Sequence, residues 1–569
     1  MNKILKSNNI PTQWNEGNLK RLYKGKGKKG KCSNERGITL ASNIGKTFER
    51  LINNRIIPNV NLTDAQAGGI KGRATVDHIM ILKELVNTSK MQKQETILTY
   101  LDVTKAYDKA WLDAVMYVLY KQGITSKLWL LVKRLNSNLK TTIHTKHGPT
   151  RQIKIKDSIR QGGVLSVILY ALMMDEINKD ITDKDLGVKI PNTECKVPCL
   201  LWMDDVLLIE QKKAEMQKLL DITYDTSQKY HVEFGMSKTN FLRTSKKKGK
   251  MDLKIGNKSI EETDKYQYLG EINNKNMNLS DQIKRIEGKV EAAFQTILTV
   301  TEDRDFKGIK MESIWKLINA CIIPIITYGC ETWEPNKQEM KKLNQILDKI
   351  IRRVLMTPDA TPREALYIET GLIDIETIID IKRMNMFSRL KKDRSQLMDK
   401  ILNNPECKWK KKTLETLEKY NTFEWELAEE KTYVKSIIQE RAYAKFKERM
   451  SENPDNKTKL EFYLENKGEW EPGIAAEYMK SLTRKPVSTI FRARTRMTKV
   501  KGNYKNGHRD LTCRACKSKP ETHQHVLYEC ETIHTGRKER DRIDPFVNNN
   551  NKLRIHANEI DRIIDMLDH

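Results

Sequence analysis

The sequence predicts an α+β protein, because strand-like and helical patterns alternate in one part of the chain and helical patterns dominate the next. Between Tyr100 and Gly270, short apolar runs of strand character alternate with helical segments. Beyond residue 275 the apolar spacing becomes helical. With 569 residues, the chain is long enough for two to four domains with cores of their own.

The elements of the first half follow in order from local patterns. Residues 97–103 form an apolar run that predicts a buried strand carrying Asp102. The turn at residues 157–163 leads into residues 164–173, which are apolar nearly all round and therefore predict a buried helix. Residues 200–209 predict two buried strands that are joined at a pair of adjacent aspartates.

The second half is predicted to be helical. Ser280 is a suitable cap for a helix whose apolar stripe consists of Ile283, Ile286, Val290, Ala293, Phe294 and Ile297. We expect further helices to about residue 400. From about 400 to 500 the sequence is charged and only weakly periodic, although still helical in character.

Composition indicates a soluble intracellular protein that binds polyanions. The formal net charge of +28 favours long nucleic acid as a partner, since binding it releases many counterions. An anionic membrane surface is the rival partner, but no apolar run is long enough to span a bilayer, and the N-terminus lacks the apolar core of a signal peptide. Nine dispersed cysteines are typical of reduced thiols, which predicts the nucleus, the cytoplasm or both.

The adjacent acids Asp204 and Asp205 predict a metal site. Two neighbouring carboxylates at a turn between buried strands repel each other and resist ionisation unless cations lie between them. Asp102 has a similar apolar setting about a hundred residues earlier. Three carboxylates at one sheet edge are what a two-metal phosphoryl-transfer site requires.

Seven sequence fragments resemble the motifs of reverse transcriptases, in the order in which that family has them. Residues 102–111 resemble motif A, 160–166 motif B, 202–205 motif C and 235–239 motif D; residues 268–270 resemble the start of the primer grip, and 34–40 and 66–73 resemble fingers motifs. In wording, order and spacing they are most similar to the reverse transcriptases of non-long-terminal-repeat (LINE-type) retrotransposons. The likeness covers roughly residues 15 to 400.

The resemblance implies a right-hand polymerase with fingers, a ferredoxin-like palm and a helical thumb, followed by a helical C-terminal region and a small zinc-knuckle-like module. The expected divisions are 1–95 fingers, 96–275 palm with the catalytic motifs, 276–400 helical thumb and connection, 401–505 charged helical region, 506–535 zinc-binding module and 536–569 tail.

The resemblance also assigns catalytic and metal-binding roles. Asp102, Asp204 and Asp205 would hold two Mg²⁺ ions, with the carbonyl of Val103 as a further ligand. Lys238 would donate a proton to the leaving pyrophosphate, although a solvated lysine is an equally good interpretation of this residue.

Five residues are expected to bind the incoming deoxynucleotide. Tyr107 matches the bulky position that excludes a ribose 2′-hydroxyl, the alternative being simple core packing. Gln161 would approach the nucleotide and the template base, next to Met203, which replaces the frequent alanine of motif C. Arg36 would bind the triphosphate, with Lys31 as a helper.

A cysteine-rich cluster near the C-terminus predicts zinc. Cys513, Cys516, His525 and Cys530 have the spacing C-x2-C-x8-H-x4-C, and three thiolates with one imidazole suit a closed, structural zinc site. His523 is a competing ligand, and reduced cysteines in a basic tail are the alternative without metal. A similar cluster lies at the C-terminal end of LINE-type polymerases, where it would help to grip RNA.

The expected function is RNA-directed DNA synthesis without an endonuclease or ribonuclease H of its own. The expected partners are an RNA template, a DNA or RNA–DNA primer–template duplex and deoxynucleoside triphosphates, with no membrane and with the oligomeric state open. A decayed or co-opted element protein that only binds RNA is the main alternative. An RNA-dependent RNA polymerase is a second one, against which Tyr107 argues.

Overall fold

The computed structural model describes residues 1–25, 27–28, 30–31, 34–104, 106–145, 148–155, 158–160, 162–244, 249, 251–300, 309–452, 457–503, 510–535 and 543–568. The chain divides into two compact units. The first unit consists of Met1–Asn278 and Asp393–Lys411, and the second of Leu279–Lys392 and Lys412–His569.

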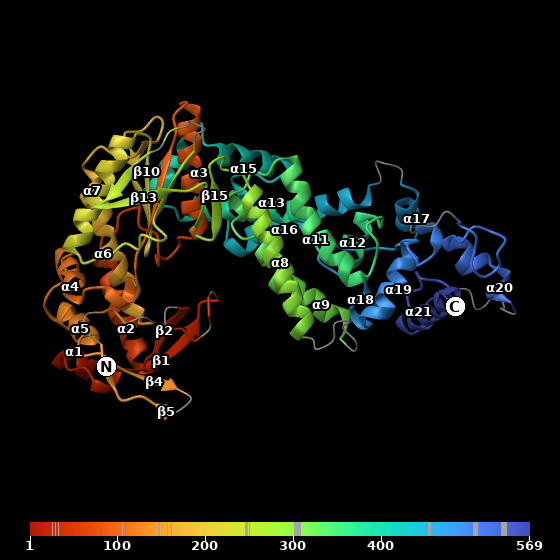
Figure 1. Ribbon diagram of the computed structural model, residues 1–569, viewed down its shortest axis with the longest axis horizontal. Coiled ribbons are helices and arrows are strands. Elements are labelled where there is room, and N and C mark those ends of the chain that lie inside the picture. Colours follow the sequence, from red (N-terminus) through yellow and green to blue (C-terminus); the bar gives the residue numbers. More distant parts are fainter. Residues whose placement is uncertain are drawn as a thin grey trace. The chain divides into compact units, whose positions relative to one another are not determined.

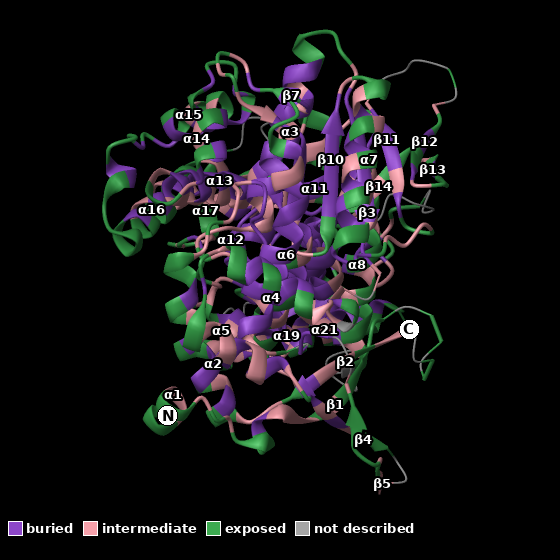
Figure 2. Cartoon of the chain, turned by 90° about the vertical axis from the view of Figure 1, so that its left-hand side faces the viewer, coloured by how far each residue is buried: buried purple, intermediate pink, exposed green. Residues whose placement is uncertain are grey.

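A six-stranded sheet forms the centre of the first unit. In spatial order its strands are β12 (Leu253–Ile255), β13 (Lys258–Glu262), β11 (Asn240–Arg243), β3 (Ile97–Asp102), β10 (Asp205–Glu210) and β9 (Cys199–Trp202). β3 is antiparallel to both of its neighbours, β11 and β10. β3 and β10 are buried except for the aspartate that each carries at one end, as Figure 2 shows for β10.

Helices cover this sheet and extend the first unit. They are α1 (Asn2–Ser7), α2 (Asn43–Ile56), α3 (Thr75–Met91), α4 (Leu112–Lys121), α5 (Ser126–Asn136), α6 (Val164–Thr182), α7 (Lys213–Lys229) and α14 (Gln396–Asn403) (Figure 1). α6 contacts β9, while α7 contacts β10 and β12. Most residues of α6 are buried, as its apolar circumference predicts.

A second, smaller sheet lies near the N-terminus. It consists of β2 (Glu35–Leu40), β1 (Glu16–Tyr23), β4 (Lys140–Thr145) and β5 (Gly148–Pro149), and β6 (Ile153–Lys154) pairs with β4. Two short hairpins complete the strands of this unit: β7 (Val188–Lys189) with β8 (Lys196–Val197), and β14 (Lys265–Tyr268) with β15 (Glu271–Asn274). In the described residues, the strands belong to the first unit alone.

The second unit is helical, as the spacing beyond residue 275 predicts. Its helices are α8 (Ser280–Val300), α9 (Met311–Leu317), α10 (Ile323–Ile326), α11 (Lys337–Leu355), α12 (Arg363–Thr370), α13 (Ile375–Lys392), α16 (Lys431–Ser451), α17 (Thr458–Asn466), α18 (Glu477–Ser481), α19 (Arg484–Arg494), α20 (Glu531–His534) and α21 (Asn550–Asp568). α15 (Lys408–Lys419) crosses the division between the units. The predicted stripe of α8 enters a core cluster, with Ala293 only partly buried.

Residues near the C-terminus, which the sequence predicts to be a tail, contain the helix α21. This helix packs against α19, and its apolar face enters the same core cluster as α8. None of the described helices is both long and apolar enough to cross a bilayer.

Candidate active site

Three aspartates lie at one end of the six-stranded sheet. β9 and β10 form an antiparallel hairpin in which Asp205 pairs with Trp202, so Met203 and Asp204 make a two-residue turn. On its other side β10 pairs with β3, and Asp205 lies directly opposite Asp102. The buried strands thus bring the three carboxylates of the sequence prediction to the same sheet edge.

The carboxylates at this edge share a negatively charged setting. Surrounding protein atoms, and then the charges of Asp204 and Asp102, raise the pKa of Asp205 to about 6. Burial, followed by the charge of Asp102, also raises the pKa of Asp204. Solvent still reaches both side chains, which are exposed. An accessible group of like charges of this kind favours the binding of cations.

Lys238 is bound to the first of the aspartates. Its Nζ donates to both carboxylate oxygens of Asp102, at 3.2 and 3.1 Å. The backbone N–H of Gly235 donates to the Asp102 carbonyl at 2.7 Å. A Cβ at Gly235 would lie only 3.1 Å from Asp102 Oδ2 and 3.0 Å from Thr104 Oγ1, so this close approach favours glycine. The segment that carries Lys238 is therefore held against the strand that carries Asp102.

Tyr107 and Arg36 lie close enough to Asp204 for electrostatic interaction with its carboxylate. Tyr107 belongs to a short 3₁₀ turn (Ala106–Lys109), and its ring packs against Tyr170 of α6 with the ring centroids 4.8 Å apart. Burial and the charge of Asp204 raise the pKa of Tyr107 to about 12. Arg36 on β2 has the opposite effect on its neighbour, because its positive charge lowers the pKa of Asp204.

Gln161 and Lys31 are two further residues that the sequence predicts to bind the nucleotide. Gln161 lies outside the described residues. The next residue, Gly162, has φ +105°, and a Cβ there would lie 3.1 Å from the Thr39 carbonyl, so the turn before α6 meets β2. Lys31 is exposed in the loop before β2, where its backbone pairs with Lys28 and Asn34.

The oxygen ligands predicted for magnesium lie at the same end of the sheet. Asp205 pairs directly opposite Asp102, and Asp204 precedes Asp205 in the hairpin turn. Val103 is buried and forms an isolated bridge with Phe234 beside them. All of these donors are hard oxygens, the type that Mg²⁺ prefers.

A comparison with known protein families finds a match for the unit that contains this site. Residues 26–272 match the family described as reverse transcriptase (RNA-dependent DNA polymerase). The matched segment contains all strands of the six-stranded sheet and all three aspartates. The chain carries a reverse transcriptase domain. The predicted α+β fold class is thereby confirmed, and the six-stranded sheet lies within the residues that the sequence predicts to be the palm.

Retrotransposon proteins are among its relatives, which confirms the resemblance to the non-long-terminal-repeat family. The chain is 24% identical over 366 residues to a Pol polyprotein of the type-1 retrotransposable element R2 from Popillia japonica, covering 61% of the chain and 49% of the relative. It is 21% identical to a probable RNA-directed DNA polymerase from the transposon X-element of Drosophila melanogaster, covering 70% and 44%. The chain thus spans less than half the length of these relatives.

A solved structure, apo telomerase from Candida tropicalis, is similar with a TM-score of 0.38 at 12% identity. The similarity covers 75% of this chain and 70% of the telomerase chain.

The cysteine-rich cluster of the second unit forms a compact ligand set. The ligand atoms of Cys513, Cys516, His525 and Cys530 all lie within 4.8 Å of one another. Cys513 Sγ lies 4.0 Å from Cys530 Sγ, and thiolates bound to tetrahedral zinc lie about 3.8 Å apart. Hydrogen bonds from the Ser518 hydroxyl and nearby backbone N–H groups lower the pKa of Cys516 to about 5, which favours the thiolate. This donor set is compatible with zinc.

The structure also separates the two competing histidines. His525 presents Nε2 to Cys516 Sγ at 3.3 Å. His523 is buried elsewhere, with its Nδ1 2.9 Å from Thr498 Oγ1. His525 therefore belongs to the ligand set and His523 does not.

Three residues near the active site carry no local signal of their role in the sequence. Glu49 of α2 accepts hydrogen bonds from the Val164 and Leu165 N–H groups, which begin α6. His78 of α3 packs edge-on against Trp202 of the hairpin. Gln66 bonds to the hairpin turn itself. In each case the partner is more than 100 residues away in the sequence, so local patterns do not predict the contact.

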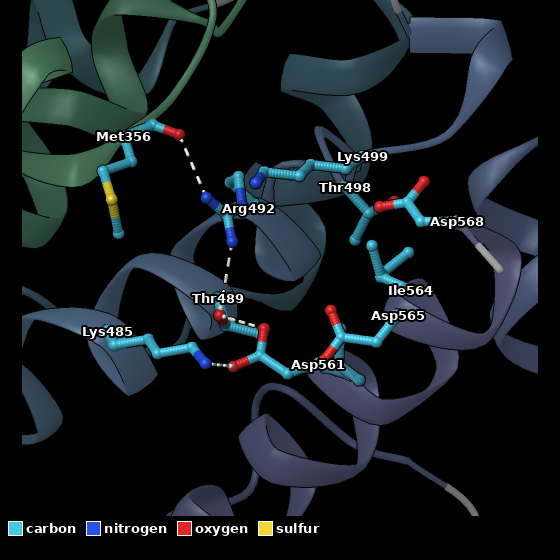
Figure 3. Close-up of a pocket in the computed structure, with 11 residues that line it drawn as sticks. Met356, Lys485, Thr489, Arg492, Thr498, Lys499, Asp561, Ile564, Asp565 and Asp568 are labelled. Carbon is cyan, nitrogen blue, oxygen red and sulfur yellow. Dashed lines mark hydrogen bonds and ion pairs between the residues drawn. The ribbon is translucent and has the colours of Figure 1, made fainter.

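A cavity of about 300 Å³ in the second unit is a separate feature. It lies between α19 and α21, and Figure 3 shows the residues that line it. Lys485 pairs with Asp561, and Arg492 donates to the Met356 carbonyl and to Thr489 (Figure 3). None of the predicted site residues lines this cavity. Its pairing of opposite charges indicates a role in packing α21 against α19.

Proposed function

We propose that the chain is an RNA-directed DNA polymerase of a non-long-terminal-repeat retrotransposon. The observation that carries the proposal is the register of the palm, in which Asp205 of the hairpin lies opposite Asp102 and beside Asp204. A reverse transcriptase domain with these three acids intact has the chemical groups that nucleotidyl transfer requires.

Asp102, Asp204 and Asp205 are the residues that would hold two Mg²⁺ ions, together with the Val103 carbonyl. Their fit rests on the donor chemistry and on the raised pKa of Asp204 and Asp205, which has burial as its largest cause and, after it, neighbouring negative charge that a cation would neutralise. When bound, magnesium activates the primer 3′-hydroxyl and stabilises charge on the phosphates. The protein itself orients these acids through the hairpin and the paired strands.

Residues around the acids would select and bind the nucleotide. Tyr107, held by its packing on Tyr170, would stand against the sugar and exclude a 2′-hydroxyl. Arg36 would bind the triphosphate, with Lys31 assisting, and Met203 and Gln161 would border the nucleotide. Lys238 is bound to Asp102, so a proton transfer to pyrophosphate would require it to leave that ion pair.

The partners follow from the domain and from the charge. The net charge of +28 supports the binding of an RNA template and a primer–template duplex, with deoxynucleoside triphosphates as substrates. Zinc held by Cys513, Cys516, His525 and Cys530 would fix the fold of a small module. The basic residues Arg514, Lys517 and Lys519 near it suit RNA.

Primer extension by the purified chain tests the proposal. With an RNA template, Mg²⁺ and deoxynucleotides, the wild type is expected to make cDNA, and Asp204→Asn is expected to make none. Asp221→Asn is the matched control, since Asp221 is an exposed acid on α7 bound to Gln217. Unimpaired synthesis by Asp204→Asn would contradict the proposal.

The alternative function, RNA binding alone, predicts a different pair of results. It requires RNA binding by the wild type without any extension of the primer. Under the polymerase proposal, Asp204→Asn keeps its affinity for RNA and loses extension alone, because phosphate contacts depend on the basic residues rather than on the acids. The expectation that the chain lacks nuclease domains of its own stays a prediction.

A further inference from the structure

A segment after α2 pairs with β9, the outermost strand of the six-stranded sheet. The palm ends at β9, and Leu201 of β9 forms a parallel bridge with Gln66. The Ala67 N–H donates to the Leu201 carbonyl at 3.0 Å, and the Leu201 N–H donates to the Ala65 carbonyl at 2.7 Å. Residues 65–67 therefore extend the sheet by a short piece of chain and cover the edge next to the catalytic hairpin.

Gln66 continues this contact from the strand into the turn. Its Oε1 accepts hydrogen bonds from the Met203 N–H at 3.2 Å and from the Gly68 N–H at 2.9 Å. The residue is 4% exposed, so water does not compete for these bonds. A single side-chain oxygen thus joins the catalytic turn to the covering segment.

The turn that Gln66 holds is conformationally unfavourable. Met203 has φ +58°, a left-handed conformation that residues with a Cβ rarely adopt. It directly precedes Asp204, so its backbone direction determines where the Asp204 carboxylate points. A residue in this conformation persists only when its surroundings fix it, and the bond from its N–H to Gln66 is one such constraint.

The covering segment packs closely against the hairpin turn at Gly68. A Cβ added at Gly68 would lie 2.5 Å from the Met203 backbone nitrogen and 2.5 Å from its Cγ. Glycine is therefore required for the segment to approach the turn so closely.

We propose that Gln66 is a positioning residue of the active site: its carboxamide oxygen holds Met203 in the left-handed conformation that orients Asp204 beside Asp102 and Asp205, where Mg²⁺ would bind. The proposal rests on the proposed polymerase function. Gln66 does not contact the substrate in this role, and it acts through the hairpin turn.

Three variants separate this role from simple stabilisation. Gln66→Leu removes the oxygen that accepts the Met203 N–H while keeping much of the side-chain volume. Gln66→Glu keeps an acceptor oxygen in either protonation state. Thr63→Val is the matched control, because Thr63 lies in the same segment and loses its hydroxyl bond to the buried Asp175, away from the hairpin.

Amide hydrogen exchange provides a measurement that does not need activity. In Gln66→Leu, the Met203 N–H is expected to exchange about tenfold faster or more than in the wild type, because its acceptor is gone. Gln66→Glu and Thr63→Val are expected to retain wild-type exchange at Met203. Equal exchange in the wild type and Gln66→Leu, with both folded by thermal melting, would overturn the proposal.

Primer extension then tests the consequence for catalysis. Gln66→Leu is expected to lower kcat by about 10- to 100-fold, with the deoxynucleotide KM changed by less than about threefold, since misaligned ligands slow chemistry more than binding. Gln66→Glu should recover most of this loss, and Thr63→Val should show none. An active Gln66→Leu with wild-type kcat contradicts the proposal. If the wild type makes no DNA, the polymerase function fails, and the exchange comparison still decides the role of Gln66.

Discussion

Tyr107 shows how a residue of ordinary type acquires a specific role from its neighbours. Its ring packs against Tyr170 of α6, and burial, followed by the charge of Asp204, raises the pKa of Tyr107 to about 12. The phenol therefore stays neutral at physiological pH, and we propose that the ring excludes a ribose 2′-hydroxyl. The sequence predicts this residue through its offset of five from Asp102; its support by Tyr170 becomes visible only in the fold.

Replacing Tyr107 by alanine tests whether its ring excludes the ribose 2′-hydroxyl. Tyr107→Ala is expected to raise the use of ribonucleotides relative to deoxynucleotides by about 10- to 100-fold, because the clash with the 2′-hydroxyl disappears. The measurement is the ratio of kcat/KM for the two sugars in primer extension. Tyr117→Ala, on the exposed face of α4, is the control. An unchanged ratio in Tyr107→Ala would remove the steric role.

His78 is a second residue whose setting is unusual. It is 1% exposed, it packs against Trp202, and in the described residues neither ring nitrogen has a hydrogen-bond partner. Burial, with a smaller contribution from the charge of Arg73, lowers the pKa of His78 to about 3. The imidazole beside the catalytic hairpin is therefore neutral in the folded protein.

The lowered pKa makes stability depend on pH in a defined direction. In the unfolded chain His78 takes up a proton below about pH 6.5, whereas in the folded chain it does not until about pH 3, so acid favours unfolding. Between pH 7 and pH 5 this residue is expected to remove about 2 kcal/mol from the free energy of unfolding.

Denaturant unfolding at several pH values measures this effect. His78→Leu should reduce the loss between pH 7 and pH 5 relative to the wild type. His144→Ala, an exposed histidine of β4, should leave it unchanged. The same loss in His78→Leu as in the wild type would show that His78 is not its source.

At the scale of elements, the structure joins pieces whose partners lie far apart in the sequence. The hairpin of β9 and β10, the buried helix α6 and the amphipathic α8 each follow from local apolar spacing, so they could be predicted. The bonds from Glu49 to the start of α6 and from Gln66 to Met203 could not, because they depend on which elements meet in the fold. For the same reason, the sequence does not decide which of His523 and His525 joins the three cysteines, because the choice depends on the residues around each in the fold.

The cysteine-rich cluster makes that distinction between His523 and His525 testable. His525→Ala is expected to weaken zinc binding by more than about 100-fold, because it removes one of four ligands. His523→Ala is expected to retain one zinc ion per chain, since His523 pairs with Thr498 outside the ligand set. Metal content after competition with a chelator gives the answer. Loss of zinc in His523→Ala and retention in His525→Ala would reverse the assignment.

At the scale of the whole molecule, the two compact units differ in structure and in the candidate sites that they contain. The first unit carries the six-stranded sheet and its three acids, and the second is helical and contains the cysteine cluster. The sequence predicts this change from mixed to helical structure near residue 275, and the first unit's main segment ends at Asn278. It does not predict that Asp393–Lys411 returns to the first unit, because that return rests on contacts such as those from Glu84 to the Lys408 and Trp409 N–H groups.

The net charge of +28 is also a property of the whole molecule. It supports the binding of nucleic acid by the chain as a whole rather than by one residue. The chemistry, in contrast, depends on very few groups. The complete chain is therefore the right object for the decisive test, because binding and synthesis are then measured on the same molecule.

The rate at which the full chain adds one deoxynucleotide to a primer on an RNA template, measured under single-turnover conditions with Mg²⁺, tests the account most directly. Asp102→Asn is expected to lower this rate by about 10³-fold or more while RNA binding persists. Asp113→Asn, an exposed acid of α4, is expected to stay within about threefold of the wild type. A rate for Asp102→Asn equal to that of the wild type would contradict the assignment of the three palm acids as the catalytic centre.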